Sequence, residues 1–339
     1  MHTETIGTAQ TYTTIQGWED GRDGVLTEIE KGQCLGEAFD EDVTIDGSTT
    51  ASDKYMWLTS VAGAEHDGRA NEVSSAGNAR IEGNANVGKV YSQDEYFRID
   101  WMEVYGNSTD AAQYLAFYSN NIGACTVDVH HNIFHNNQKD NSNDCYGVRP
   151  NDSSAVWRVH HNIIYGFGGI GLSLGAAAAN SEAFNNTVYE CNSSDDVALG
   201  GLLGTDADWN CNNNIAFNNG TSDFVETAGT YDYNADSDGS GSGENSISPV
   251  TSVAAELTNP TTTWANTDLT IKDTDAQIYG SGINGSDAGF EDVCGGDVDV
   301  NVPISDRNAT LDLEGSWSMG ADDIIAAGGS ILLLRLVME

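Results

Sequence analysis

The chain has 339 residues, and its 13 lysine and arginine residues against 52 aspartate and glutamate residues give a net charge of −39 at pH 7. Such a charge repels nucleic acid phosphates and anionic membranes, and no basic segment offsets it, so we expect neither nucleic acid binding nor membrane insertion. The 38 glycines against 4 prolines favour an all-β protein with many tight turns.

Residues 1–40 are predicted to form an N-terminal cap. A short helix is expected within residues 12–20, where Ile15 and Trp18 share one face and Thr13 or Thr14 suits the N-cap position. Residues 1–5 lack the basic and apolar stretches of a signal peptide, which predicts synthesis in a cytoplasm. The six cysteines form no CxxC pair, so a zinc site is not expected. Their even number allows disulfides, but synthesis in a cytoplasm favours buried free thiols.

Residues 41–233 are predicted to form a solenoid, because this part of the chain contains an internal repeat. Four segments align without gaps, and each has a central asparagine: Asn132, Asn162, Asn186 and Asn214. Repeats of 20–50 residues indicate stacked coils, whereas a propeller blade takes about 40 residues or more. Residues 55–61, 79–90 and 99–105 fit earlier coils of the same solenoid.

Each repeat alternates apolar and polar residues, as expected for a half-buried strand. The inward positions are Val129, Val159, Ala183 and Cys211, and the outward positions are Asp128, Arg158, Glu182 and Asn210. The prediction is therefore an all-β, right-handed parallel β-helix with a short N-terminal capping helix.

The repeated asparagines are interpreted as structural. Coils stacked in register lie about 4.8 Å apart, so Asn132, Asn162, Asn186 and Asn214 would lie above one another. Their side-chain amides can then hydrogen-bond from coil to coil, as in the asparagine ladders of cross-β structures. Asparagine also tolerates the left-handed conformation that a corner between strands requires.

Four histidines occupy equivalent positions in two repeats, His130 with His160 and His131 with His161. Stacking would bring equivalent imidazoles to about 5 Å from each other. That arrangement suits a transition metal or a proton relay, and the alternative is polar stacking beside the asparagine corner.

A carbohydrate site is a further hypothesis. Basic residues of the best-defined coils, Lys139, Arg149 and Arg158, together with Asp128 and Asp152, could bind or process an acidic glycan. The alternative is that Arg158 pairs with Asp128 or Glu182 on neighbouring coils. Acid and base roles for paired carboxylates are also open at the adjacent pairs Asp195–Asp196 and Asp322–Asp323. Four tryptophans are candidates for sugar stacking, although two of them should point inward: Trp57, Trp101, Trp157 and Trp209.

The C-terminal third is less regular. Residues 234–247 are rich in Gly, Ser and Asp and are predicted to form a loop, and residues 248–339 are predicted to form terminal β-helix coils and a C-terminal tail. The sequence predicts no cofactor other than a candidate Ca²⁺, for which the aspartates of 236–238 and 297–299 are possible ligands although they lack the spacing of a known calcium loop. The apolar residues 331–338 are expected to be buried against a neighbour.

The repeats of residues 95–220 resemble those of right-handed parallel β-helix repeat proteins, a group that includes pectate lyases and phage tailspikes. Residues 304–323 resemble the closing segment common in that group, and residues 5–20 are similar to the opening of β-helix proteins encoded by tailed phages and environmental viral genomes. The Gly-His-Gly and Arg-x-Lys motifs of polygalacturonases are missing.

This resemblance implies the fold and suggests a virion location. The first hypothesis is a virion structural or appendage protein (tail, fibre or capsid-associated) that acts as a homo-oligomer or with other virion proteins and attaches to surface glycans. The alternatives are a polysaccharide lyase or glycoside hydrolase of the β-helix type, and an extracellular location. Function must be argued from a site rather than from the fold.

Overall fold

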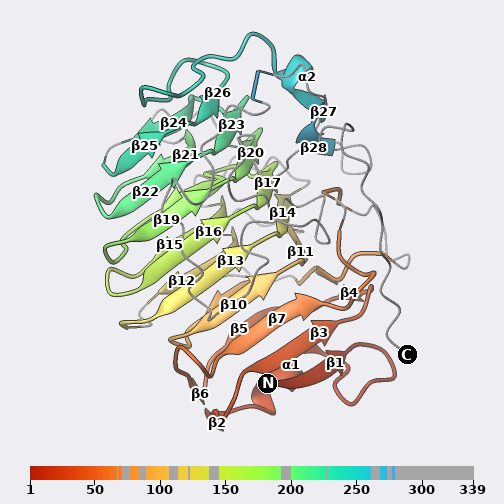
Figure 1. The fold of residues 1–339 in the computed structure, drawn as a ribbon. Helices are drawn as coiled ribbons and strands as arrows, with labels where there is room; N and C mark the ends of the chain where they lie inside the picture. Colours follow the sequence, from red (N-terminus) through yellow and green to blue (C-terminus); the bar gives the residue numbers. More distant parts are fainter. Residues whose placement is uncertain are drawn as a thin grey trace, which may run out of the picture.

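The protein is a parallel β-helix, as predicted, seen here in a computed structural model (Figure 1). The structure describes residues 1–66, 68–70, 77–83, 89–106, 114–120, 123–136, 145–191, 200–226, 228–260, 268–272 and 277–278. Within these ranges, three parallel sheets run along the solenoid, and in each coil the chain passes from the first sheet to the second and then to the third.

The first sheet has nine strands. They are β1 (His2–Ile6), β3 (Glu30–Cys34), β7 (Met56–Ser60), β10 (Phe97–Asp100), β13 (Thr126–His130), β16 (Val156–His160), β19 (Ser181–Phe184), β22 (Trp209–Asn212) and β25 (Thr230–Asp232).

The second sheet has eight strands. They are β4 (Ala38–Phe39), β8 (Arg80–Ile81), β11 (Glu103–Gly106), β14 (Ile133–Asn136), β17 (Ile163–Tyr165), β20 (Thr187–Tyr189), β23 (Ile215–Phe217) and β26 (Ala235–Asp236).

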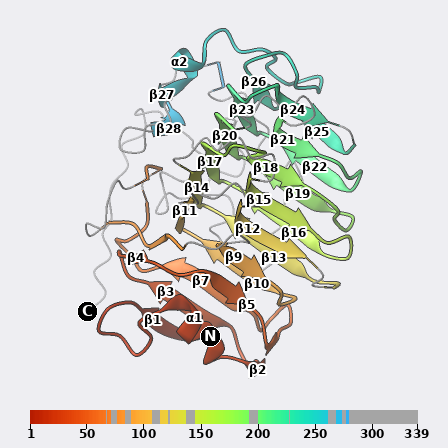
Figure 2. The same ribbon diagram turned by 180° about the vertical axis from the view of Figure 1, so that it is seen from behind.

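The third sheet, seen from behind in Figure 2, has seven strands. They are β5 (Val43–Ile45), β9 (Val90–Ser92), β12 (Tyr114–Asn120), β15 (Cys145–Asn151), β18 (Leu172–Leu174), β21 (Gly200–Gly204) and β24 (Ser222–Glu226).

Two smaller features flank the solenoid. Strands β2 (Gly24–Val25) and β6 (Ser48–Thr49) pair at the N-terminal end. At the other end lie helix α2 (Val253–Glu256) and an antiparallel pair, β27 (Leu257–Asn259) and β28 (Asp268–Ile271). No helix in the described ranges is long and apolar enough to span a membrane.

The short N-terminal helix is present, as predicted, within residues 1–40. Helix α1 (Ile15–Asp20) begins after Thr14, whose hydroxyl accepts a hydrogen bond from the Gly17 amide, and Ile15 and Trp18 are fully buried. Strands β1 and β3 already pair in the first sheet, so solenoid strands begin before the expected boundary at residue 41.

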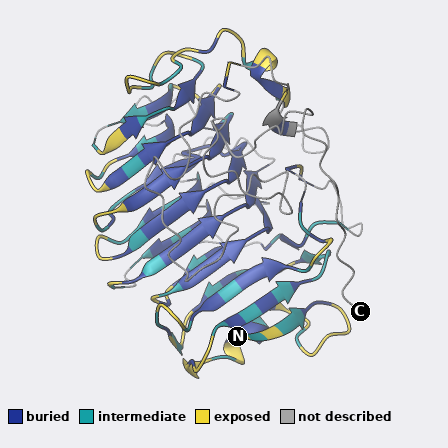
Figure 3. Cartoon of the chain, in the orientation of Figure 1, coloured by how far each residue is buried: buried dark blue, intermediate teal, exposed yellow. Residues whose placement is uncertain are grey.

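The repeat predicts the register of the coils. Val129 pairs with Val159, Val159 with Ala183, and Ala183 with Cys211, and all four belong to the apolar core. Figure 3 shows that the strands are largely buried and that exposed residues gather at the turns. Five cysteines are buried free thiols, as expected, and the sixth, Cys294, lies outside the described residues.

A ladder of asparagines connects successive coils, and it has a fifth member, Asn234. Each Nδ2 donates to the Oδ1 of the next asparagine, at 3.1 Å for Asn132–Asn162, 3.0 Å for Asn162–Asn186, 3.0 Å for Asn186–Asn214 and 3.3 Å for Asn214–Asn234. The Oδ1 of each later asparagine also accepts from the backbone amide of the preceding ladder residue, as in Asn132 N to Asn162 Oδ1 at 3.1 Å, and Asn132 Oδ1 accepts from Met102 N at 3.1 Å.

The corner conformation was predicted for the wrong residue. The ladder asparagines are not left-handed; the residue before each of them is, with φ of 52° at His131, 53° at His161, 52° at Asn185 and 58° at Asn213. The physical reason is that the side chain of the ladder residue hydrogen-bonds along the solenoid, whereas the residue before it adopts the left-handed conformation that turns the chain.

Several predicted segments cannot be placed. Residues 279–339 lie outside the described residues, and with them the closing segment, the apolar tail, Asp297–Asp299 and Asp322–Asp323. The expected loop at 234–247 contains β26 and a parallel bridge between Ala235 and Ile247, so it begins as another coil of the solenoid.

Candidate functional site

Two columns of polar side chains lie on the first sheet, outside the apolar core. We call them the polar face. In register, the first column contains Trp57, Arg98, Asp128, Arg158 and Glu182, and the second contains Asp100, His130, His160 and Phe184. Asp128, His130 and His160 are completely buried, and Arg158 and Glu182 are each 6% exposed. Three of the predicted outward positions, Asp128, Arg158 and Glu182, are therefore off the core but buried, and the fourth, Asn210, is half-exposed.

Charge pairing explains how these groups are buried. Arg98 Nη2 lies 2.9 Å from Asp100 Oδ2, and Trp57 Nε1 donates to the same carboxylate at 3.1 Å. Arg158 Nη1 lies 3.2 Å from Glu182 Oε2 on the next coil. The interpretation that Arg158 pairs with a neighbouring coil is thus confirmed for Glu182. Buried ions that are paired avoid much of the desolvation cost.

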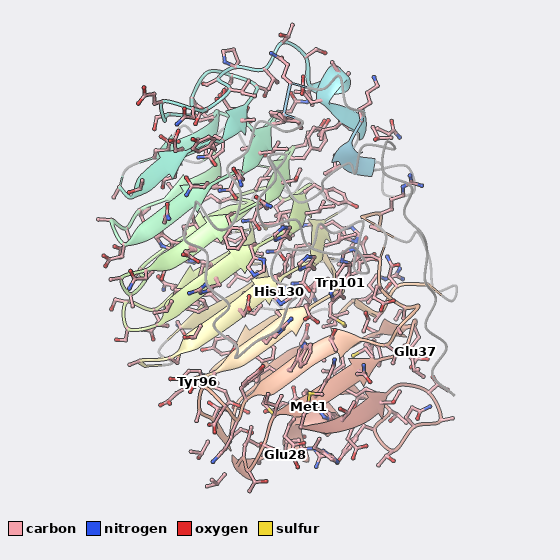
Figure 4. All side chains as sticks on the ribbon, in the orientation of Figure 1. Met1, Glu28, Glu37, Tyr96, Trp101 and His130 are labelled. Carbon is pink, nitrogen blue, oxygen red and sulfur yellow. The ribbon has the colours of Figure 1, made fainter. Side chains whose placement is uncertain are left out.

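The histidines stack as the repeat predicts (Figure 4 labels His130 and Trp101). The His130 and His160 rings lie 4.7 Å apart and 3° from parallel, and the His131 and His161 rings lie 4.7 Å apart and 2° from parallel. Trp101 continues the second stack, with its ring 4.7 Å from that of His131.

Hydrogen bonds across each histidine pair fix the tautomers of the His160 coil. His161 Nε2 accepts from Asn185 Nδ2 at 3.0 Å, so the proton of a neutral His161 ring is on Nδ1, which donates to His160 Nδ1 at 2.9 Å. The proton of a neutral His160 ring is then on Nε2, which lies 3.2 Å from Asp128 Oδ1. Every proton in this chain is assigned with both imidazoles neutral.

The preceding coil has the same arrangement of a carboxylate and two imidazoles. His130 Nε2 lies 3.5 Å from Asp100 Oδ2, and His130 Nδ1 lies 2.7 Å from His131 Nδ1. The backbone oxygen of His131 also lies 2.8 Å from His66 Nε2, which donates to it. The polar face thus holds two parallel carboxylate–imidazole–imidazole chains.

The environment keeps the imidazoles neutral. Burial lowers the pKa of His130 and of His161 well below the ordinary value of 6.5. Burial also lowers the pKa of His160, although Asp128 opposes that shift. For Asp128, burial raises the pKa, but His160 and the guanidinium groups of Arg98 and Arg158 outweigh burial, so the pKa is lowered.

A metal site at the histidines stays a prediction. His130, His131 and His160 each offer a ring nitrogen, and these atoms all lie within 4.8 Å of one another. Imidazole nitrogens suit zinc, copper, nickel and iron. The Nδ1 atoms are already engaged in hydrogen bonds, so a metal ion would have to displace protons that hold the two rings of a pair together.

The four glycan candidates are divided between two sheets. Asp128 and Arg158 belong to the polar face, whereas Arg149 is on β15 of the third sheet and Asp152 follows that strand. Asp152 Oδ1 accepts from the Ser154 amide at 2.7 Å, which gives it a turn-forming role. Arg149 stacks on tyrosines, 4.6 Å from the centre of the Tyr146 ring.

The structure places the remaining glycan and acid–base candidates as follows. Trp157 and Trp209 are buried in the core, as predicted. Lys139 and the pair Asp195–Asp196 lie outside the described residues. Trp57 is clamped between Lys31, at 3.5 Å from its ring centre, and Arg98, at 4.4 Å.

The calcium candidate near residue 236 also stays a prediction. Carboxylate oxygens of Asp223, Asp236 and Asp238 lie within 4.8 Å of one another. Burial raises the pKa of Asp223 to about 6. Its Oδ2 accepts from the amide of Ser237 at 2.7 Å, so part of this cluster organises the loop itself.

Sequence reasoning missed several members of the polar face and of the ladder. Arg98 and Asp100 pair in register with Asp128 and His130, and the 30-residue spacing of the earlier coil was the signal that could have found them. Asn234 follows Asn214 by one short coil of 20 residues. The shorter spacing, and Tyr233 in the place of the histidine or asparagine that precedes the other ladder residues, make this repeat hard to recognise in the sequence.

Comparison with known proteins found one similar solved structure. No protein-family model and no curated protein matches the chain. Among solved structures, the chain is similar to a pectin methylesterase from Aspergillus niger, crystallised in deglycosylated form, at 12% sequence identity and a TM-score of 0.34. The match covers 69% of this chain and 76% of that one.

Proposed function

We propose that this protein is a rigid structural component of a virion, an appendage protein of a tail, a fibre or a capsid, and that it acts as a homo-oligomer or with other virion proteins. The observation that carries the proposal is the asparagine ladder, which joins five successive coils through side chains as well as backbone. A solenoid is held together by contacts between neighbouring coils, so a continuous ladder makes a stiff rod.

The burial of the polar face supports the same proposal. An enzyme that acts on a polysaccharide must bring its acid, base and cationic groups into contact with a polymer, and Asp128, His130 and His160 have no exposed surface. The His130 and His160 rings stack between coils, and each makes a hydrogen bond to the neighbouring histidine within its own coil. The resemblance of residues 5–20 to the opening of viral β-helix proteins favours a particle over an extracellular enzyme.

The alternative is a polysaccharide lyase or glycoside hydrolase. One observation favours it: the Asp128–His160–His161 chain is flanked by Arg98 and Arg158, which combines an acid–base group with cations suited to a uronate. Sealing this array against solvent would prevent the reaction, so the alternative requires the polar face to open.

Imaging distinguishes the two functions. Native particles from the source would be labelled with an antibody against this chain and viewed by electron microscopy. Ordered label on a tail, fibre or capsid is expected. Free single rods that depolymerise acidic or neutral glycans would overturn the structural proposal and establish the enzyme, and Asp128→Asn would then abolish the activity.

A further inference from the structure

The outer face of the third sheet carries a second, half-exposed group of side chains, which we call the tyrosine face. Tyr91 of β9, Tyr118 of β12 and Arg149 of β15 lie in register on three successive coils. Asn120 and Tyr146 lie beside them on the same strands, and all five are partly exposed, unlike the polar face.

Stacking and hydrogen bonds hold these side chains in place. The Tyr91 and Tyr118 rings are 5.5 Å apart and 12° from parallel. The Tyr91 hydroxyl donates to Asn120 Oδ1 at 2.8 Å, and Asn120 Nδ2 donates to the Tyr118 hydroxyl at 2.7 Å. The Arg149 guanidinium carbon lies 5.8 Å from the Tyr118 ring centre and 4.6 Å from that of Tyr146. The face is therefore organised before any ligand arrives.

Arg149 has no carboxylate partner among the residues that the structure describes. This is unusual in a chain with 52 acidic and 13 basic residues, and other arginines are paired: Arg22 with Glu4, Arg98 with Asp100, and Arg158 with Glu182. A guanidinium offers five N–H donors in a planar fork that matches a carboxylate. Aromatic rings hold this one through cation–π contacts, which leave its donors for a ligand.

We propose that the tyrosine face binds a glycan that carries a carboxylated sugar. Arg149 pairs with the carboxylate in a bidentate manner, and the tyrosine hydroxyls and the amide of Asn120 hydrogen-bond to neighbouring sugar hydroxyls. This inference deepens the proposed appendage role, on which it rests in part, because it names the surface and the ligand through which an appendage would attach.

The net charge of the protein limits which acidic glycans can bind at this face. At −39, the protein repels a dense polyanion such as nucleic acid, and a single guanidinium neutralises only one group. A glycan whose uronate residues are separated by neutral sugars brings one carboxylate to Arg149 and few others near the surface. At about 0.15 M salt, where the screening length is about 8 Å, remote carboxylates of the protein oppose this contact only weakly.

The test is calorimetry with the full chain at about 0.15 M salt. The probes are an alternating uronate–N-acetylhexosamine oligosaccharide and the same oligosaccharide after its carboxylates are reduced to alcohols. We expect the uronate probe to bind, and the reduced probe and R149A to show at least a tenfold loss, on the order of the free energy of a charge-assisted hydrogen bond. R149K keeps the charge without the fork and should lose less.

Two controls make the result decisive. K54A removes one positive charge at a separate turn and should bind like the wild type, and circular dichroism checks that each variant is folded. Equal binding by R149A, equal binding of the reduced probe, or no binding of the uronate probe to the wild type would each overturn the inference. Particle labelling without glycan binding would leave the appendage role intact, and glycan binding by a chain absent from particles would do the reverse.

Discussion

Removing one rung of the asparagine ladder is the most direct test of how the coils are joined. Asn162 is buried in the middle of the ladder, and Asn162→Ala removes four hydrogen bonds at once. Its Nδ2 donates to Val129 O at 2.8 Å and to Asn186 Oδ1 at 3.0 Å, and its Oδ1 accepts from the backbone and side chain of Asn132 at 3.1 Å each.

The size of the loss follows from what each partner keeps. Asn132 Nδ2 still donates to Ile99 O at 3.0 Å, and Asn186 Oδ1 still accepts from the Asn162 backbone at 3.2 Å. The Asn132 amide, however, has no other acceptor among the described residues, and a stranded buried donor costs about 1–3 kcal/mol. With roughly 1 kcal/mol for each of the other three bonds, we expect a destabilisation of about 4–6 kcal/mol.

Urea unfolding followed by circular dichroism measures this loss. The matched control is Asn151→Ala at the partly exposed end of β15, for which we expect a change within about 0.5 kcal/mol, as for most surface substitutions. A second variant, Asn162→Asp, keeps the acceptor for Asn132 but turns an oxygen toward Val129 O, and should also be strongly destabilised near neutral pH. A loss below about 1 kcal/mol for Asn162→Ala, or one equal to the control, would refute the ladder as a source of stability.

Two pH-dependent predictions follow from buried titratable groups. Burial raises the pKa of Glu19 to about 8 and that of Asp94 to about 7, so the folded state holds these protons more tightly than the unfolded state. The free energy of unfolding should therefore fall as pH rises from 5 toward 8, by roughly 1 kcal/mol per pH unit for each group. Glu19→Gln should reduce that slope, measured by urea unfolding at pH 5–9. An unchanged slope would contradict the assignment. His161 has a pKa that burial lowers well below 6.5, so its contribution is present above pH 6.5 and is lost as pH falls through the folded pKa. His161→Asn places at this corner the residue type that Asn185 supplies in the next coil, at φ values of 53° and 52°, and should lessen the drop in melting temperature between pH 8 and pH 5; a variant as acid-sensitive as the wild type would show that other groups cause the drop.

The sequence predicted the solenoid, its core and its ladder because the repeat converts linear spacing into stacking. Once Asn132, Asn162, Asn186 and Asn214 are aligned, every neighbouring position is aligned too, and the stacked histidines follow from the same alignment. Buried side-chain amides need hydrogen-bond partners, so aligned asparagines are expected to bond to one another.

The tertiary structure alone decided what the repeat does not encode. Alternation placed Asp128 and Arg158 off the core, and only the structure shows that both are buried beside His160 and Glu182 on neighbouring coils. The left-handed corner fell on the residue before each ladder asparagine, because a side chain that spans two coils leaves the bend to its neighbour. The tyrosine face is built from third-sheet strands that share no motif, so only the folded coils bring Tyr91, Tyr118 and Arg149 into one row.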